Sequence, residues 1–101
     1  MALMEVIVSP RKEGVVSVAD ELVPAIEALQ ASGLKYEIHA MGTNVEGPVE
    51  DLLRVAGEMH AATFRSGVLR VVTSIRLDDR RDKEATLADK AAHLRTRVGD
   101  A

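Results

Sequence analysis

Two stretches of the chain combine carboxyl, hydroxyl and amide side chains within strand-like sequence. The first holds Thr43, Asn44 and Glu46, and the second holds Arg70, Thr73 and Ser74. A strand that ends near Ser9 is expected to lie between them in the sheet. These groups could contact a small polar ligand, because they offer both hydrogen-bond donors and acceptors. The alternative is structural: Glu46 and Arg70 form an ion pair at a strand end, and the threonines are ordinary strand formers.

Other kinds of site find little support in the sequence. His39, His60 and His93 lie on separate predicted elements, and the chain has no Cys, so we expect no metal site. No glycine-rich loop resembles a phosphate cradle, and no serine lies in a G-x-S-x-G motif. No acid–base pair with a perturbed environment can be named either. We therefore expect no cofactor and no enzymatic activity.

A second polar cluster lies at residues 78–83, which read Asp-Asp-Arg-Arg-Asp-Lys. Alternating charges of this kind are typical of a solvated turn, whose local ion pairs contribute little to stability. A contact between subunits is the other role that we retain for this segment, and we favour both over a ligand site.

Length, charge and hydropathy exclude several classes of protein. A chain of 101 residues with 47% hydrophobic residues predicts a single domain over residues 1–101. The 13 Lys and Arg against 16 Asp and Glu give a net charge of −3, which offers no basis for nucleic-acid binding. No stretch approaches the ~20 apolar residues of a membrane span, and the N-terminus lacks a signal-peptide pattern. We expect a cytoplasmic protein that contacts neither nucleic acid nor membrane.

Hydrophobic periodicity predicts the elements that position these side chains. Alternating or β-branched runs predict strands over 3–8, 34–39, 41–46 and 68–77. Apolar residues at helical spacing predict helices over 17–33, 48–63 and 87–98. This order, with its tight central hairpin, is typical of an α+β ferredoxin-like sandwich, βαββαβ with an additional C-terminal helix.

The two faces of this predicted sheet differ. The two long helices cover one face, and the first and fourth strands place apolar residues such as Val6 and Ile7 on both faces. A monomer would then expose an apolar patch. We therefore expect a homo-oligomer with two-fold symmetry, a dimer or a tetramer, formed through sheet faces.

Longer sequence blocks carry a family resemblance over nearly the whole chain. Residues 36–47 read Tyr-Glu-Ile-His-Ala-Met-Gly-Thr-Asn-Val-Glu-Gly, and residues 70–83 read Arg-Val-Val-Thr-Ser-Ile-Arg-Leu-Asp-Asp-Arg-Arg-Asp-Lys, with His60 and Phe64 between them. These blocks resemble the MGTxxEG and RVxTSIxxDDRRDK patterns of the thiamine-binding, YkoF-like proteins, also called DUF77 or UPF0045. The chain departs from the pattern at His39-Ala40, where relatives often have a residue followed by Pro.

The resemblance implies a ferredoxin-like fold, homo-oligomers built by pairing of sheets, and binding of thiamine or its hydroxymethylpyrimidine part without known catalysis. An aminopyrimidine presents an exocyclic amine beside ring-nitrogen acceptors, and the thiazolium is cationic, which suits an acidic protein. We predict that Ser9, Ser17, Thr43, Glu46 and Thr73 contact the ligand and that Arg70 orients Glu46.

Two functions from different classes follow. The first is non-enzymatic binding of thiamine or its pyrimidine part, as a carrier or sensor in thiamine salvage. The second is a structural or regulatory oligomeric interaction protein that binds no vitamin and uses residues 78–83 in subunit contacts.

Overall fold

The protein folds into a four-stranded antiparallel sheet with helices packed against it. The computed structural model describes residues 1–11, 13, 19–83 and 86–99. Its elements in chain order are β1 (Ala2–Pro10), α1 (Ala19–Ser32), β2 (Lys35–His39), β3 (Gly42–Gly47), α2 (Val49–Thr63), the 3-10 turn η1 (Phe64–Ser66), β4 (Val71–Asp78) and α3 (Leu87–Arg97). This order confirms the predicted ferredoxin-like plan with an additional C-terminal helix.

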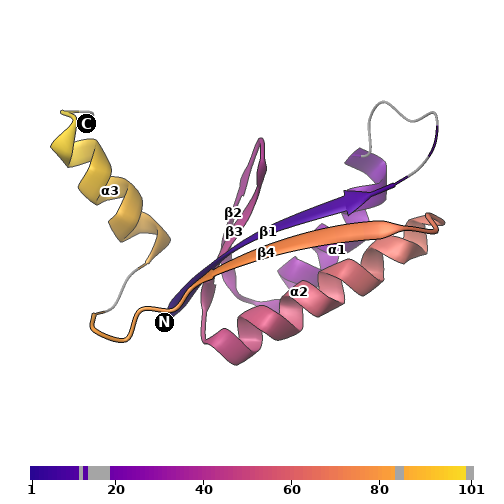
Figure 1. Ribbon diagram of the computed structural model, residues 1–101, viewed down its shortest axis with the longest axis horizontal. Coiled ribbons are helices and arrows are strands. Elements are labelled where there is room, and N and C mark those ends of the chain that lie inside the picture. Colours follow the sequence, from indigo (N-terminus) through magenta and orange to yellow (C-terminus); the bar gives the residue numbers. More distant parts are fainter. Residues whose placement is uncertain (12, 14–18, 84–85, 100–101) are drawn as a thin grey trace.

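The strands lie in the order β2-β3-β1-β4, and each neighbouring pair is antiparallel. Figure 1 shows β1 and β4 running side by side along the length of the molecule, with the β2-β3 hairpin on the other side of β1. β4 starts later than predicted, because Gly67, which follows η1, has a left-handed φ of 92°, and the chain resumes extended structure only at Val71.

The helices α1 and α2 cover one face of the sheet, which we call the helix face. Met4 and Val6 of β1 and Val45 of β3 point to this face and pack against Leu29 of α1 and Leu52 of α2. These alternate strand positions and the helical spacing of the buried residues in α2 are the two apolar periods seen in the sequence. The core therefore lies between the sheet and these two helices.

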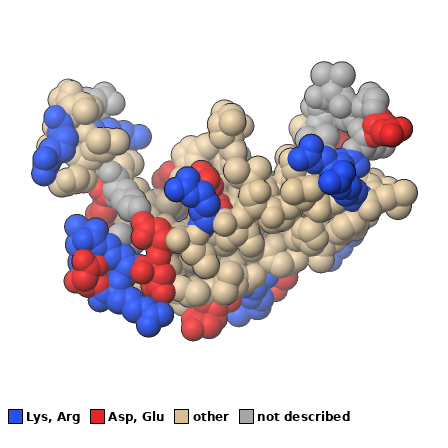
Figure 2. Space-filling model, viewed as in Figure 1, with Lys and Arg blue, Asp and Glu red and all other residues tan. Residues whose placement is uncertain are grey.

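On the opposite face of the sheet, the open face, α3 is the described element that lies over the strands, and it does so at one end of the sheet (Figure 1). Strand alternation places the polar residues Glu5, Ser9, Ser74 and Arg76 on this face. Ile7 lies on the same face and is 37% exposed. The expected large apolar patch on this face is thus wrong, because polar side chains occupy most of its positions in β1 and β4. Figure 2 shows acidic and basic side chains mixed at the end of the molecule where the turn after β4 lies, below α3.

Candidate functional site

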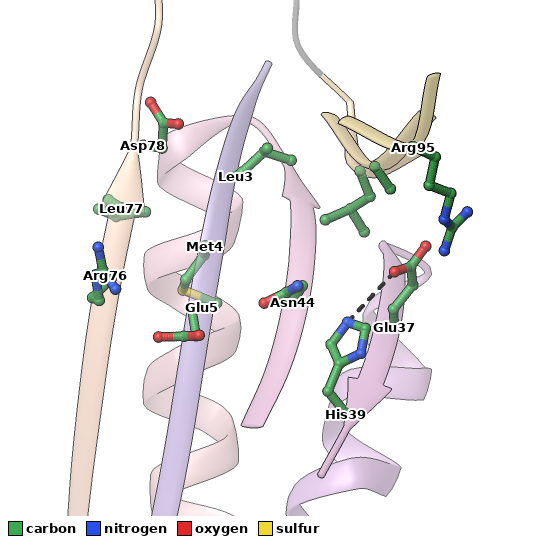
Figure 3. A pocket seen from close by; sticks show the side chains of 12 residues that line it. Leu3, Met4, Glu5, Glu37, His39, Asn44, Arg76, Leu77, Asp78 and Arg95 are labelled. Atoms are coloured by element: carbon green, nitrogen blue, oxygen red, sulfur yellow. Dashed lines mark ion pairs between the residues drawn. The ribbon is translucent and has the colours of Figure 1, made fainter. Parts of the chain in front are cut away.

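A cavity of about 380 Å³ lies between the open face of the sheet and α3, and we call it the sheet-face cavity. All four strands contribute to its floor, and α3 forms its roof through Leu87, Ala91 and Arg95. Figure 3 shows the polar side chains of the floor and the side chain of Arg95, which descends from α3 toward Glu37. The cavity therefore exists only while α3 stays docked on the sheet.

Strand register explains why polar groups converge here. Glu37 of β2 lies opposite Asn44 of β3, Asn44 lies opposite Glu5 of β1, and Glu5 lies opposite Arg76 of β4. Directly opposite residues in antiparallel strands point to the same face. These four residues thus form one transverse row across the sheet, and all four line the cavity.

The lining combines three carboxylates with two guanidinium groups and one imidazole. The carboxylates are those of Glu5, Glu37 and Asp78, and the cations are Arg76 and Arg95. His39 Nε2 lies 3.5 Å from Glu37 Oε2, an ion pair when the imidazole is protonated (Figure 3). Carboxylate and amide oxygens accept hydrogen bonds, so the floor of the cavity can hold an amine or a cationic ring.

Glu46 lies in the adjacent transverse row, opposite Lys35 and Leu3. Its side chain is 8% exposed, and its Oε2 accepts a hydrogen bond of 3.0 Å from the backbone amide of Leu87 at the start of α3. Its Oε1 lies 3.9 Å from Lys35 Nζ. Glu46 is therefore engaged by α3 and by Lys35, and it is not among the residues that line the cavity.

The structure does not gather the residues predicted as ligand contacts. Thr43 and Thr73 point to the helix face: Thr43 is 7% exposed, and the hydroxyl of Thr73 lies 2.7 Å from Nδ1 of His60 on α2. Ser9 lies on the open face opposite Val72, at the far end of β1 from Glu46. Ser17 lies outside the described residues.

The expected pairing of Arg70 with Glu46 is wrong. The carbonyl of Arg70 accepts a hydrogen bond of 2.8 Å from the amide of Arg11, beyond the end of β1, whereas Glu46 lies opposite Leu3 near its start. The intervening length of strand separates them by about 25 Å at ~3.3 Å per residue. Arg70 therefore cannot orient the Glu46 carboxylate within one chain.

Sequence reasoning missed Glu5, Glu37, Arg76 and Arg95 as site residues. The signal that could have found the first three is parity along the strands. Thr43 and Glu46 are an odd number of positions apart, so they cannot share a face, whereas Asn44 and Glu46 can. Arg95 was beyond such reasoning, because its place depends on where α3 docks.

A second cavity of about 330 Å³ lies between α1 and the β2-β3 hairpin. Its lining is mostly apolar and includes Val6, Leu22, Ile38 and Met41, with Thr43 among them. It offers few polar groups to orient a ligand, so the sheet-face cavity is the better candidate.

Within the described ranges, no group of three or more His, Asp or Glu is arranged to hold a metal ion. None of the helices in the described part of the chain has both the length and the apolar character that a bilayer span requires.

Comparison with known proteins places the chain among similar sequences and folds. The UPF0045 protein YqgV of Bacillus subtilis is 47% identical over 66 residues, and this match spans 64% of each chain, less than two thirds. The UPF0045 protein MJ1052 of Methanocaldococcus jannaschii is 40% identical over 86 residues, or 85% of this chain and 84% of that protein.

Solved structures agree with these sequence matches over the full fold. The crystal structure of MJ1052 aligns with a TM-score of 0.81 at 33% identity, covering 99% of this chain and 97% of that one. A DUF77 domain from Bacillus cereus aligns with a TM-score of 0.83 at 31% identity, covering 95% and 91%. The family model described as thiamine-binding protein matches residues 4–95, from β1 into α3. The chain therefore belongs to the thiamine-binding protein family, whose members include the UPF0045 and DUF77 proteins.

Proposed function

We propose that this protein binds thiamine, or its aminopyrimidine half, in the sheet-face cavity. Membership of the thiamine-binding family supports the class of ligand. The observation that carries the proposal is the transverse row of Glu37, Asn44, Glu5 and Arg76, which brings acceptors and donors to the floor of one cavity. A volume of about 380 Å³ is also in the range of small-molecule sites.

The aminopyrimidine half fits the centre of this row. Its exocyclic amine donates hydrogen bonds, and a carboxylate such as that of Glu5 accepts them. The side-chain amide of Asn44, which lies opposite Glu5, can donate to a ring nitrogen and accept from the same amine. Recognition in this arrangement is led by hydrogen bonds, because the described residues that line the cavity include no Phe, Tyr or Trp.

The thiazolium half carries a positive charge and suits the remaining carboxylates. Glu37 and Asp78 line the cavity on either side of the central strands, on β2 and β4. A cation close to a partly desolvated carboxylate gains more than it would in bulk water, because the effective dielectric constant is lower there. The alkyl parts of the ligand would contact Leu3 on the floor and Leu87 and Ala91 on the roof.

We propose further that the ligand is bound without chemical conversion, by a homo-oligomer that acts in the cytoplasm as a carrier or sensor in thiamine salvage. The oligomer is supported by an apolar stripe on α3 and the residue after it, where Leu94 is 64% exposed and Val98 is 70% exposed. A stripe of this kind is normally covered by another surface. Recovery of unaltered thiamine after prolonged incubation, checked by proton NMR, tests the absence of conversion.

Isothermal titration with thiamine, thiamine phosphate and hydroxymethylpyrimidine in parallel tests the binding proposal. Saturable binding of thiamine and of the free pyrimidine is expected, since both carry the group that Glu5 and Asn44 recognise. Absence of heat and of thermal stabilisation with all three compounds would overturn the proposal and favour an interaction protein without a vitamin ligand.

A further inference from the structure

In the part of the chain that the structure describes, a hydrogen bond joins the roof of the sheet-face cavity to the sheet. The carboxylate of Glu46 accepts a hydrogen bond from the backbone amide of Leu87, the first residue of α3. The two residues are 41 positions apart in the sequence. Leu87 is 7% exposed, whereas Leu94 further along α3 is 64% exposed. Among the described residues, α3 meets the sheet chiefly at β3. Docking therefore depends on the first turn of the helix.

The chemistry of this attachment favours a carboxylate. The first amides of a helix have no partner within the helix, and the helix dipole attracts negative charge to this end. The hydroxyl oxygen of Thr86 accepts a hydrogen bond of 3.0 Å from the backbone amide of Asp89, and the Glu46 carboxylate accepts one from the backbone amide of Leu87. One helix end is thus capped partly by its own residue and partly by a residue from the sheet.

α3 is too short to be stable in isolation. It spans 11 residues, and isolated helices shorter than ~12–15 residues are marginal in water. Loss of docking would therefore both remove the roof of the cavity and loosen the helix itself.

From this arrangement we infer that Glu46 is a positioning residue that fastens α3 over the sheet-face cavity, and that α3 is the movable wall through which the ligand enters and leaves. The ligand-entry part of the inference rests on the proposed function. A ligand that touches Ala91 and Arg95 binds the docked form more tightly than the undocked form, so it shifts the population toward docking. Glu46 then acts on affinity through α3 and has no contact with the ligand.

Hydrogen exchange without any ligand tests the fastening directly. Glu46→Ala is expected to raise the exchange rates of the α3 amides about tenfold, because removal of a charge-assisted hydrogen bond weakens the docking of α3 by a corresponding factor. Protection in β1 and β3 should change little. Glu46→Gln should stay closer to the wild type, because its amide oxygen can still accept the Leu87 amide. Equal α3 exchange in Glu46→Ala and the wild type would overturn the inference.

A second pair of variants addresses the donor and leaves the sheet untouched. Leu87→Pro removes the amide that Glu46 accepts, and proline is well tolerated at the first position of a helix. Thr86, which precedes it, already has the extended backbone that a following proline requires, with φ −115° and ψ 166°. Leu87→Ala is the matched control, since it removes the same side chain but keeps the amide. Faster α3 exchange in Leu87→Pro than in Leu87→Ala supports the inference, and equal exchange contradicts it.

Binding kinetics then separate positioning from direct contact. With thiamine as the probe, Glu46→Ala should weaken binding and speed dissociation, while Glu46→Gln should retain most of the affinity. An equal loss in both variants with α3 exchange unchanged would make Glu46 a ligand contact and overturn its positioning role. If no thiamine compound binds the wild type, the proposed function fails, and the exchange data still decide whether Glu46 fastens α3.

Discussion

The imidazole Nδ1 of His60 on α2 lies 2.7 Å from the hydroxyl oxygen of Thr73 on β4, and this contact ties the helix layer to the edge strand of the sheet. The ring of Phe64 stands edge-on to the same imidazole, with ring centroids 5.5 Å apart. His60 and Thr73 are both half-buried. Thr73 therefore serves the packing of α2 against β4, on the face of the sheet away from the cavity.

Replacement of Thr73 by valine tests this role. Valine keeps the shape and removes the hydroxyl, so Thr73→Val should lower the free energy of unfolding by about 1 kcal/mol, the usual net value of a hydrogen bond. Urea denaturation gives the change, and titration with thiamine should give an unchanged Kd. A tenfold loss of affinity at unchanged stability would instead return Thr73 to the ligand site.

The fold was predictable because the sequence shows distinct hydrophobic patterns for its strands and for its helices. Residues 3–8 form a short apolar run rich in β-branched side chains, residues 34–39 alternate apolar and polar side chains, and the buried residues of α2 recur at helical spacing. The hairpin follows from the short segment between β2 and β3, and the order of elements leaves few arrangements. Only the ends moved, as at β4, where the left-handed Gly67 delays the strand.

The site was less predictable because it depends on which residues share a row, and on α3. Grouping Thr43 with Glu46 ignored parity, and grouping Arg70 with Glu46 ignored how far along the strands each lies. The attachment of Leu87 to Glu46 joins residues 41 apart through a backbone amide. The pattern of side chains in a sequence does not predict which backbone amide will donate to a distant carboxylate, so this contact could be found only in the three-dimensional structure.

Neutralising Glu5 tests the central row of the cavity. Glu5→Gln keeps the side-chain shape but removes the negative charge, so thiamine affinity should fall about tenfold, or roughly 1.4 kcal/mol. The matched control is Glu58→Gln on the exposed side of α2, where Glu58 pairs only with Arg54 at 3.9 Å among the described residues. Both variants change the net charge equally, so equal losses in titration calorimetry would contradict a local role for Glu5.

The turn after β4 gives a pH-dependent signal that is separate from stability. The guanidinium of Arg80 donates hydrogen bonds of 2.6 and 2.9 Å to the Asp82 carboxylate, which lowers the pKa of that carboxyl below its ordinary value. A lowered pKa means that the pair is intact above the ordinary carboxyl range and breaks as pH falls through the lowered value. Arg80→Ala should move the Asp82 pKa upward in an NMR titration.

The same variant should leave the thermal unfolding midpoint nearly unchanged, because exposed ion pairs contribute little to stability. An Asp82 pKa that is the same with and without Arg80 would show that the pair is not formed in solution.

Replacing either of two glycines by alanine should change the free energy of unfolding, in opposite directions at the two positions. Gly57 lies inside α2 and Gly67 follows η1 with φ 92°, and an added Cβ would meet nothing within 4 Å at either position. Space is therefore equal, and only the backbone differs. Gly57→Ala should stabilise the protein by about 0.5–1 kcal/mol through helix propensity, and Gly67→Ala should destabilise it by about 1–2 kcal/mol through left-handed strain. Thermal or urea unfolding of both variants checks the sign, and the same sign in both would contradict the argument.

The exposed apolar stripe of α3 makes the oligomer testable by a single charge. Leu94 is 64% exposed on α3, and Leu53 is 49% exposed on α2, so glutamate can be placed at either position without entering the core. If α3 packs against a second copy, Leu94→Glu should reduce the molar mass measured by light scattering at micromolar concentration, whereas Leu53→Glu should leave it unchanged. Burying an unpaired carboxylate in an apolar contact costs several kcal/mol, enough to separate the copies. A wild-type mass of one chain would contradict the oligomer itself, and equal masses for the wild type and Leu94→Glu would place its interface away from α3.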